Sequence, residues 1–392
     1  MKLKRREILA ATLALSGLAL SPAAMAQSEE IVKIGYSGPL SGGAAFYGKN
    51  VLDGMKFAAD EINAKGFDVA GKKVKFEIIA LDDQYNPSQT AINAQRLVQE
   101  DKVSVILVPH SGGIFAVQTR NEQQKLLLLA YSSLPEITER GNKLTIELPP
   151  NITDYMAPFV NYEMGKFGKK AAIAVTDSDY GKAWQKAFKA AWEKAGGQIV
   201  SDGTLSYNKS ADFYSGVSRA LAAKPDVMLI GGPSEPTGLV AKQARELGFK
   251  GGFAVIDQAK LDEVSKVSGG MASLDGSIGV LPTMLDPRAE TQAFVKRVQK
   301  TYPDRIVGSE IGIAYVAVYA VADAMKLAGT DSDATAIRSK MDAAFKELPP
   351  SVNFYGYTNV DAGGHALMDG RVGVVEDGKV HEVKIVDLAA KK

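Results

Sequence analysis

Six short segments of this chain carry hydroxyl, amide, aromatic or carboxylate groups directly after apolar runs. They are residues 37–47, 109–113, 131–133, 176–180, 231–237 and 257–258. Hydroxyls, free amides, aromatic rings and a carboxylate are groups that bind a small molecule through hydrogen bonds and ring contacts. Loops at the carboxyl ends of strands in open α/β sheets face one crevice, so we expect these segments to line a common cleft.

The segment 31–66 predicts how one such loop is positioned. Residues 31–36 are apolar and end at Gly-Pro, which indicates a β-strand, and residues 37–43 form a Gly-rich turn. Apolar residues then recur at helical spacing, namely Leu52, Met55, Ala59 and Ile62. Glycines that leave backbone N–H groups free, followed by a helix N-terminus, are typical of an anion site, and we expect one at this turn.

The rest of the chain alternates predicted strands and helices, which favours an α/β fold with parallel sheets covered on both faces. The alternation of strands and helices restarts after Pro149-Pro150 and becomes irregular after about residue 283. We therefore expect two doubly wound, Rossmann-like lobes joined by a multi-strand hinge. The expected boundaries are 27–149 plus 283–348 for the N-terminal lobe, and 150–282 plus 349–392 for the C-terminal lobe.

Catalytic and metal sites are not indicated. The chain has no cysteine, three scattered histidines, and neither a G-x-S-x-G nor an H-E-x-x-H motif. Asp82-Asp83 with Asn86 could suggest a metal, but Asn86-Pro87-Ser88-Gln89 is better interpreted as an N-cap followed by a proline in the first helical turn. We expect no enzyme activity, no cofactor and no metal.

The first 26 residues predict a cleaved signal peptide. A basic start precedes an apolar run and Ala24-Met25-Ala26, so the mature chain should begin at Gln27 in the periplasm. Ordinary secretion is favoured over the twin-arginine route, and no later segment is expected to span a membrane. The formal charge is +1, and removal of four basic residues and one acidic residue leaves −2. This balance gives no reason to expect nucleic acid as a partner.

Six motifs resemble, in order, the periplasmic binding proteins for leucine, isoleucine and valine. They are SGPLSGGAAFYG with the helix ending in DEIN, LDDQYNP, the Ser/Gly loop at 111–113, SSLPEIT, TDSDYG and KQARELG. The resemblance covers essentially the whole mature chain. It implies a two-lobed type I periplasmic binding protein in which the first lobe holds the ligand carboxylate and the second lobe closes over it.

The resemblance also implies site residues. Ser133, with Ser132 beside it and Tyr131 two positions earlier, would meet the ligand carboxylate. His110 or Ser111 would take the family's serine position. In the closing lobe, Tyr180 would contact the ligand, Asp257 would take its ammonium, and Ser234 would occupy a position that is often aromatic.

Structural roles compete with these ligand-binding roles. Ser132 and Ser133 could shape a turn, and Asp257 could cap a helix over 259–266. Tyr180 could pack on its own helix, and His110 could be a satisfied structural histidine. Tyr47, with Phe46, could line the apolar part of the pocket or staple the start of the helix.

The expected function is capture of a small amino-acid ligand of the branched-chain class, followed by delivery to the permease subunits of an ABC transporter. The protein is expected to be a monomer without stable membrane insertion. Two alternatives stay open at this point. The ligand could be an aromatic or aliphatic carboxylate or an amide, or the closed protein could signal to a membrane sensor.

Overall fold

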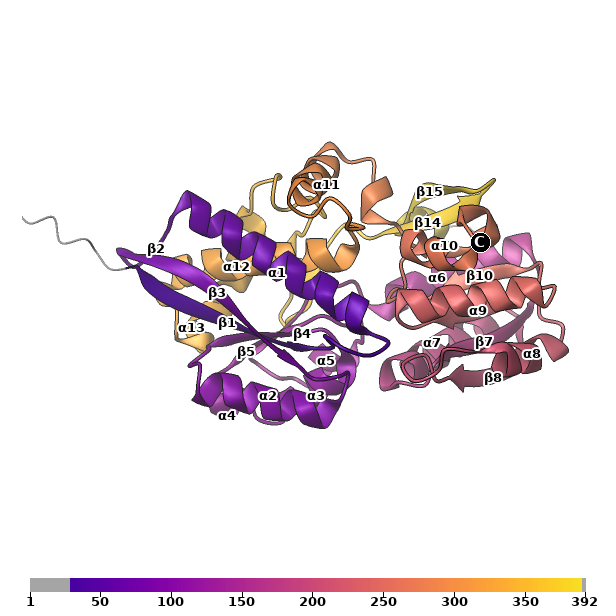
Figure 1. The fold of residues 1–392 in the computed structure, drawn as a ribbon, viewed down its shortest axis with the longest axis horizontal. Helices are drawn as coiled ribbons and strands as arrows, with labels where there is room; N and C mark the ends of the chain where they lie inside the picture. The colour runs from indigo at the N-terminus through magenta and orange to yellow at the C-terminus, as the bar shows by residue number, and fades with distance from the viewer. Residues whose placement is uncertain (1–28, 390–392) are drawn as a thin grey trace, which may run out of the picture.

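The computed structural model describes residues 29–389, and the predicted signal peptide lies outside them. The chain forms two lobes that lie side by side (Figure 1). Each lobe contains a mainly parallel sheet, and the two sheets have six and seven strands. The predicted α/β class with two doubly wound lobes is confirmed.

The first sheet comes from the N-terminal part of the chain. In spatial order its strands are β2 (Phe67–Val69), β3 (Lys72–Asp82), β1 (Glu30–Gly38), β4 (Val105–Val108), β5 (Leu127–Ala130) and β6 (Thr145–Glu147). Only β2, which pairs with β3, runs antiparallel. Its helices are α1 (Ala45–Lys65), α2 (Pro87–Gln99), α3 (Ser111–Gln118), α4 (Asn121–Gln124), α5 (Glu136–Glu139), α11 (Ala289–Thr301), α12 (Ser309–Ala328) and α13 (Ala334–Glu347).

The strands are apolar on both faces because helices cover both. Leu127 and Leu129 belong to the core that α1 and α12 complete, whereas Leu128 and Ala130 face the core that α2 and α3 complete. Successive side chains of a strand point to opposite faces, so the continuous apolar run follows from burial on both sides.

The second sheet has the spatial order β15 (Lys379–Lys384), β14 (Arg371–Glu376), β11 (Ile278–Val280), β10 (Gly252–Val255), β9 (Val227–Gly231), β7 (Lys170–Thr176) and β8 (Gln198–Leu205). Its helices are α6 (Ile152–Lys166), α7 (Asp179–Lys194), α8 (Tyr214–Ala222), α9 (Ser234–Glu246), α10 (Leu261–Ser268) and α14 (Ile385–Ala389). The short 3-10 helices η1 (Met271–Leu274) and η2 (Thr283–Leu285) and the hairpin β12 (Asn359–Val360) with β13 (Ala366–Leu367) complete the fold.

The chain passes between the lobes three times, after β6, after β11 and after β13. The orange helices α11 to α13 belong to the first lobe, where α12 packs on α1, whereas the yellow strands β14 and β15 lie in the second lobe near α10 (Figure 1). Val352, Phe354 and Val360 pack in the core of the first sheet. We therefore propose that the third crossing falls near residues 368–370, later than the boundary at 348/349 expected from sequence.

Helix α12 differs from the expectation that no later segment could span a membrane. By length and composition alone it qualifies, with a mean hydropathy of 1.5 over its apolar window. However, 78% of that window is buried within the protein, and Ala314, Val318 and Ala322 are fully buried. An all-apolar helix of this kind is the central helix of a lobe, packed between α1 and α13.

Candidate functional site

A cavity lies between the lobes, at the carboxyl ends of both sheets. The first lobe contributes the loops after β4 and β5, and the second lobe contributes the start of α7 and the loop after β10. Eight of the nine residues expected from sequence line it, namely Tyr47, His110, Ser111, Tyr131, Ser132, Ser133, Tyr180 and Asp257. The ninth, Ser234, is not among the lining residues.

Ser133 and Asp257 form the centre of the cavity and join the two lobes. Ser133 Oγ donates to Asp257 Oδ2 at 2.6 Å and lies 2.8 Å from the hydroxyl of Tyr180. Asp257 Oδ1 is buried and has no hydrogen-bond partner among the described residues. Burial raises the pKa of Asp257 to about 6, against the opposing effects of Lys260 and of the Ser133 hydroxyl. A buried carboxylate oxygen without a partner is costly, and a ligand ammonium group would satisfy it.

These contacts bear on the structural alternatives for Asp257 and Tyr180. Helix α10 begins at Leu261, and its N-cap residue is Lys260. Asp257 lies three positions earlier, so the expected cap over 259–266 is not formed by this side chain. Tyr180 packs its ring in the core, but its hydroxyl reaches across to Ser133.

The start of α3 supplies backbone donors to the cavity. Ser111 and Gly112 are the first residues of this eight-residue helix, and N–H groups at such positions have no acceptor within the helix. Ser111 lines the cavity, and so does Ser132, whose buried hydroxyl has no partner among the described residues. Two hydroxyls and free amides therefore lie opposite Asp257.

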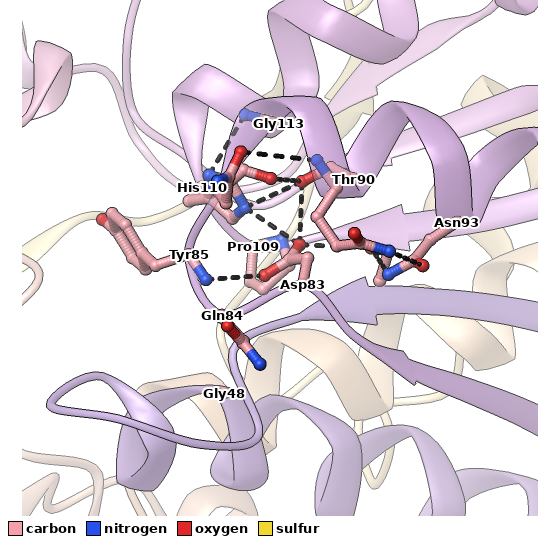
Figure 2. A network of polar contacts seen from close by, with 12 residues as sticks. Gly48, Asp83, Gln84, Tyr85, Thr90, Asn93, Pro109, His110 and Gly113 are labelled. Atoms are coloured by element: carbon pink, nitrogen blue, oxygen red, sulfur yellow. Dashed lines mark hydrogen bonds and ion pairs between the residues drawn. The ribbon is translucent and has the colours of Figure 1, made fainter.

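His110 has a structural role that the sequence did not decide. Its Nδ1 accepts from the backbone N–H of Gly113 at 3.1 Å and caps α3, so Nδ1 carries no proton. Its Nε2 lies 3.0 Å from Asp83 Oδ2 and donates to it. Both ring nitrogens are therefore occupied within the first lobe (Figure 2), and His110 presents ring carbon to the cavity.

Asp83 is the acceptor at the centre of this network. It is fully buried, and Oδ2 accepts from Ser37 Oγ at 3.1 Å and from Thr90 Oγ1 at 2.9 Å in addition to His110. Its Oδ1 accepts from the N–H of Tyr85 at 2.9 Å. Asp83 therefore has a structural role as a hydrogen-bond acceptor within the first lobe, as Figure 2 shows.

Tyr85 is a site residue that the sequence reasoning missed, and Gln258 was expected only as part of the cleft segment 257–258. The ring of Tyr85 stacks on His110 with centroids 4.6 Å apart. Its hydroxyl accepts from Gln258 Nε2 at 3.0 Å, which makes a second contact between the lobes. The signal was available, because Tyr85 lies in LDDQYNP and Gln258 directly follows Asp257.

Further aromatic, polar and aliphatic side chains line the cavity. Tyr155 and Tyr355 line it, and Tyr355 hydrogen-bonds to Thr283 at 2.6 Å. Arg288 also lines it, with both oxygens of Asp286 accepting from its Nε, at 2.9 and 3.0 Å. The aliphatic lining residues are Val280, Leu281, Ile313 and Met368. None of these residues was expected from sequence.

The turn 37–43 does not form the expected anion site. No residue of this turn lines the cavity. Leu40 N and Ser41 Oγ instead donate to Asp82, at 2.8 and 2.5 Å. Burial alone would raise the pKa of Asp82, but the hydrogen bonds from Ser41 and Leu40 lower it overall. The free donors of the turn thus bind a carboxylate of the chain itself.

Tyr47 and Ser234 are placed by other hydrogen bonds. Tyr47 lies in the first turn of α1, lines the cavity, and donates its hydroxyl hydrogen to the backbone oxygen of Pro109 at 2.8 Å. Ser234 is buried at the start of α9, where its Oγ accepts from the N–H of Lys260 at 3.0 Å.

Comparison with known proteins agrees with this architecture. The family model described as "Periplasmic binding protein" matches residues 31–379, which is most of the chain. This chain belongs to the periplasmic binding protein family. An amino acid binding protein of Pseudomonas aeruginosa is 29% identical over 302 residues, covering 75% of this chain and 78% of the relative. A Leu/Ile/Val-binding protein of Rhizobium johnstonii is 28% identical over 356 residues, covering 89% and 92%.

Solved structures of periplasmic binding proteins share the fold. The branched-chain amino acid transporter substrate binding protein LivJ of Streptococcus pneumoniae, in complex with isoleucine, has a TM-score of 0.76 at 22% identity. The match covers 91% of this chain and all of that one. A solute binding protein of R. palustris in complex with benzoate also has a TM-score of 0.76, at 17% identity, covering 90% and 96%. These relatives are solute-binding proteins rather than enzymes.

Proposed function

We propose that this periplasmic binding protein captures a small amino acid between its lobes and presents it to the permease of an ABC transporter. The observation that carries the proposal is the unpartnered Oδ1 of Asp257, which is buried in the cavity between the lobes. An ammonium group supplies the missing partner. The ligand carboxylate would then meet Ser111, Ser132, Ser133 and the free amides of α3.

The proposed mechanism is closure stabilised by a bridging ligand. Ser133 already joins Asp257 and Tyr180 across the lobes. A ligand with groups of both charges adds contacts that exist only when the lobes are together, and it therefore shifts the equilibrium toward the closed form. Delivery to a permease is supported by the relative named as a transporter substrate binding protein, and the predicted signal peptide supports a location in the periplasm.

A second candidate is an aromatic carboxylate without an amino group. The tyrosines that line the cavity, together with His110, can stack on a flat aromatic ligand, although Val280, Leu281 and Ile313 also line it. One structural relative has benzoate as its ligand. In such a complex Asp257 would be protonated and would donate a hydrogen bond instead of accepting one.

The decisive experiment compares ligands that differ only in the amino group. The mature chain is screened by thermal shift against phenylalanine and 3-phenylpropionate, and against leucine and 4-methylpentanoate. We expect stabilisation by an amino acid only. Asp257→Asn should then weaken that binding by about 3–5 kcal/mol, more than a hundredfold, because a buried charge pair loses one partner.

The matched control is Asp177→Asn, an exposed aspartate of the same lobe that does not line the cavity. We expect it to bind like the unaltered protein in calorimetry. Stabilisation by the acids that lack nitrogen, with no effect of Asp257→Asn, would exclude the amino-acid proposal and support the aromatic carboxylate.

A further inference from the structure

A second buried contact between the lobes adjoins the ligand cavity, and Lys260 lines both. Its members, which we call the carboxyl cluster, come from α1 and α12 of the first lobe and from the start of α10 in the second. They are Asn50, Glu310, Lys260, Asp262 and Glu263. Glu310 is fully buried, and Glu263 is 5% exposed.

Two contacts in the carboxyl cluster cross the interface. Asn50 Nδ2 donates to Glu263 Oε1 at 3.2 Å, and Lys260 Nζ lies 3.5 Å from Glu310 Oε1. A Cβ at Gly308, the N-cap residue of α12, would collide with Glu310 Oε2 and would lie 3.0 Å from Glu263 Oε1. The two glutamates therefore flank the same point from opposite lobes.

The carboxyl cluster has more acidic groups than donors to satisfy them. Neither oxygen of Glu310 accepts a hydrogen bond from a described residue, and the same holds for Asp262 Oδ2 and Asn50 Oδ1. Lys260 is its one cation, and that ammonium also donates to the backbone oxygen of Asp257. Among residues 29–389, no group of three histidine or acidic side chains is arranged to hold a metal ion. A proton is thus the available counter-charge.

We propose that closure of the two lobes takes up a proton from solvent, which Glu263 holds beside Glu310 at the interface. Glu310 lies 3.5 Å from the ammonium of Lys260, and the protonated Glu263 keeps one oxygen as the acceptor for Asn50. With the lobes apart, Glu263 faces water and ionises in its ordinary range. The proposal concerns closure itself and does not depend on which ligand is bound.

The titration behaviour of the carboxyl cluster supports this reading. Burial, and then Glu310 and Asp262, raise the pKa of Glu263 well above its ordinary range. Burial and Glu310 likewise raise the pKa of Asp262 to about 6. A carboxyl group with a higher pKa in the closed form binds more protons there, so closure is favoured at low pH and weakens as pH rises toward that value.

Other groups face the carboxyl cluster and contribute to the balance. The hydroxyl of Ser234 at the start of α9 stabilises the ionised form of Glu263 and opposes the shift. Both glutamates lie in the first turn of a helix, where the dipole also favours the anion. Tyr47 and Tyr131 pack near Glu310 as neutral groups. Asp257 has its own titration near pH 6 and must be separated from Glu263 by mutation.

The experiment measures closure without ligand. The chain has no cysteine, so spin labels attach specifically at Gln95→Cys on α2 and Lys186→Cys on α7, which are exposed positions in opposite lobes. Distances between the labels give the ratio of closed to open protein from pH 5 to 8.5, in an Asp257→Asn, Asp262→Asn background that removes the two other carboxyl groups whose pKa is raised to about 6. We expect this ratio to fall by up to about tenfold per pH unit, the limit for one proton.

Glu263→Gln should remove this pH dependence and leave the protein closed at high pH, and Glu310→Gln, a second variant, should also flatten it. Glu163→Gln is the control, because Glu163 is fully buried inside the second lobe and does not contact the first. It should titrate like its parent. A ratio that does not change with pH, or that changes equally in Glu263→Gln, would overturn the proposal.

Discussion

One buried carboxylate organises the cleft side of the first lobe. Asp83 accepts hydrogen bonds from Ser37, Thr90 and His110, which belong to three separate elements. These hydrogen bonds fix the position of the start of α3 beside the cavity. Neither Asp83 nor its three partners needs to contact a ligand through a polar atom. Asp83 thus acts on the site by positioning His110.

Removal of the Asp83 carboxylate should destabilise the protein strongly. We expect Asp83→Ala to lower the free energy of unfolding by about 2–4 kcal/mol, because three buried donors lose their acceptor. Urea unfolding followed by circular dichroism measures the change. Asp60→Ala, at an exposed position of α1, is the matched control and should stay within about 0.5 kcal/mol. Equal effects of the two substitutions would show that the network contributes little.

At this scale the sequence predicted which residue types meet but not how they are oriented. Ser133 and Asp257 follow strands, and strand ends alone bring them to the cleft. His110 follows a strand in the same way, yet its nitrogens face Asp83 and Gly113, which no local pattern reveals. Arg288 and Tyr355 could not be found at all, because only the crossing of the chain between lobes brings them to the cavity.

At the scale of secondary-structure elements, the close packing of α1 on α12 is the feature that can be tested. Gly54 lies in the middle of α1, and a Cβ there would collide with the backbone oxygen of Ile311 at the start of α12. The missing side chain lets the two helices approach, and Asn50 reaches the carboxyl cluster from the same helix. Apolar periodicity predicted where the strands and helices lie in the sequence. It did not predict that α1 packs on α12, which is more than 240 residues away.

Two glycine substitutions test this close contact between α1 and α12, because their expected effects on stability have opposite signs. Gly54→Ala should destabilise the protein by about 1–3 kcal/mol, because the methyl group meets backbone that cannot rotate away. Gly165→Ala, in α6, should stabilise it by up to about 1 kcal/mol, because that position has open space and alanine favours a helix. Thermal unfolding of both variants gives the comparison, and stabilisation by both would refute the close contact.

At the scale of the whole molecule, we expect the affinity of the two lobes for a ligand to depend on pH. The proposed ligand ammonium needs an ionised Asp257, and burial between the lobes raises the pKa of that carboxyl to about 6. Binding of the proposed amino acid would therefore release a proton from Asp257 below about pH 6. The proposed closure takes up a proton at Glu263. The whole molecule combines two opposite linkages.

Amino-acid affinity should therefore change little below about pH 6, because proton release from Asp257 and proton uptake at Glu263 oppose each other there, and it should fall above pH 6, where only the uptake at Glu263 remains. Calorimetry with the amino acid found by thermal shift measures this profile. Glu263→Gln should convert it into an affinity that rises up to about pH 6 and is then constant. Affinity that does not fall above pH 6 in the unaltered protein would contradict proton uptake at Glu263 while leaving the role of Asp257 intact.

The chain passes between the lobes three times, and this topology affects when the protein can fold during its synthesis. Glu61 and Tyr315 hydrogen-bond across 254 positions of sequence, and the second sheet receives β14 and β15 only at the end of the chain. Neither lobe has all its parts until synthesis is almost complete. Non-local contacts of this kind form late. We therefore expect a chain with this topology to stay largely unfolded through most of its synthesis, which would suit the secretion in extended form that the sequence predicts.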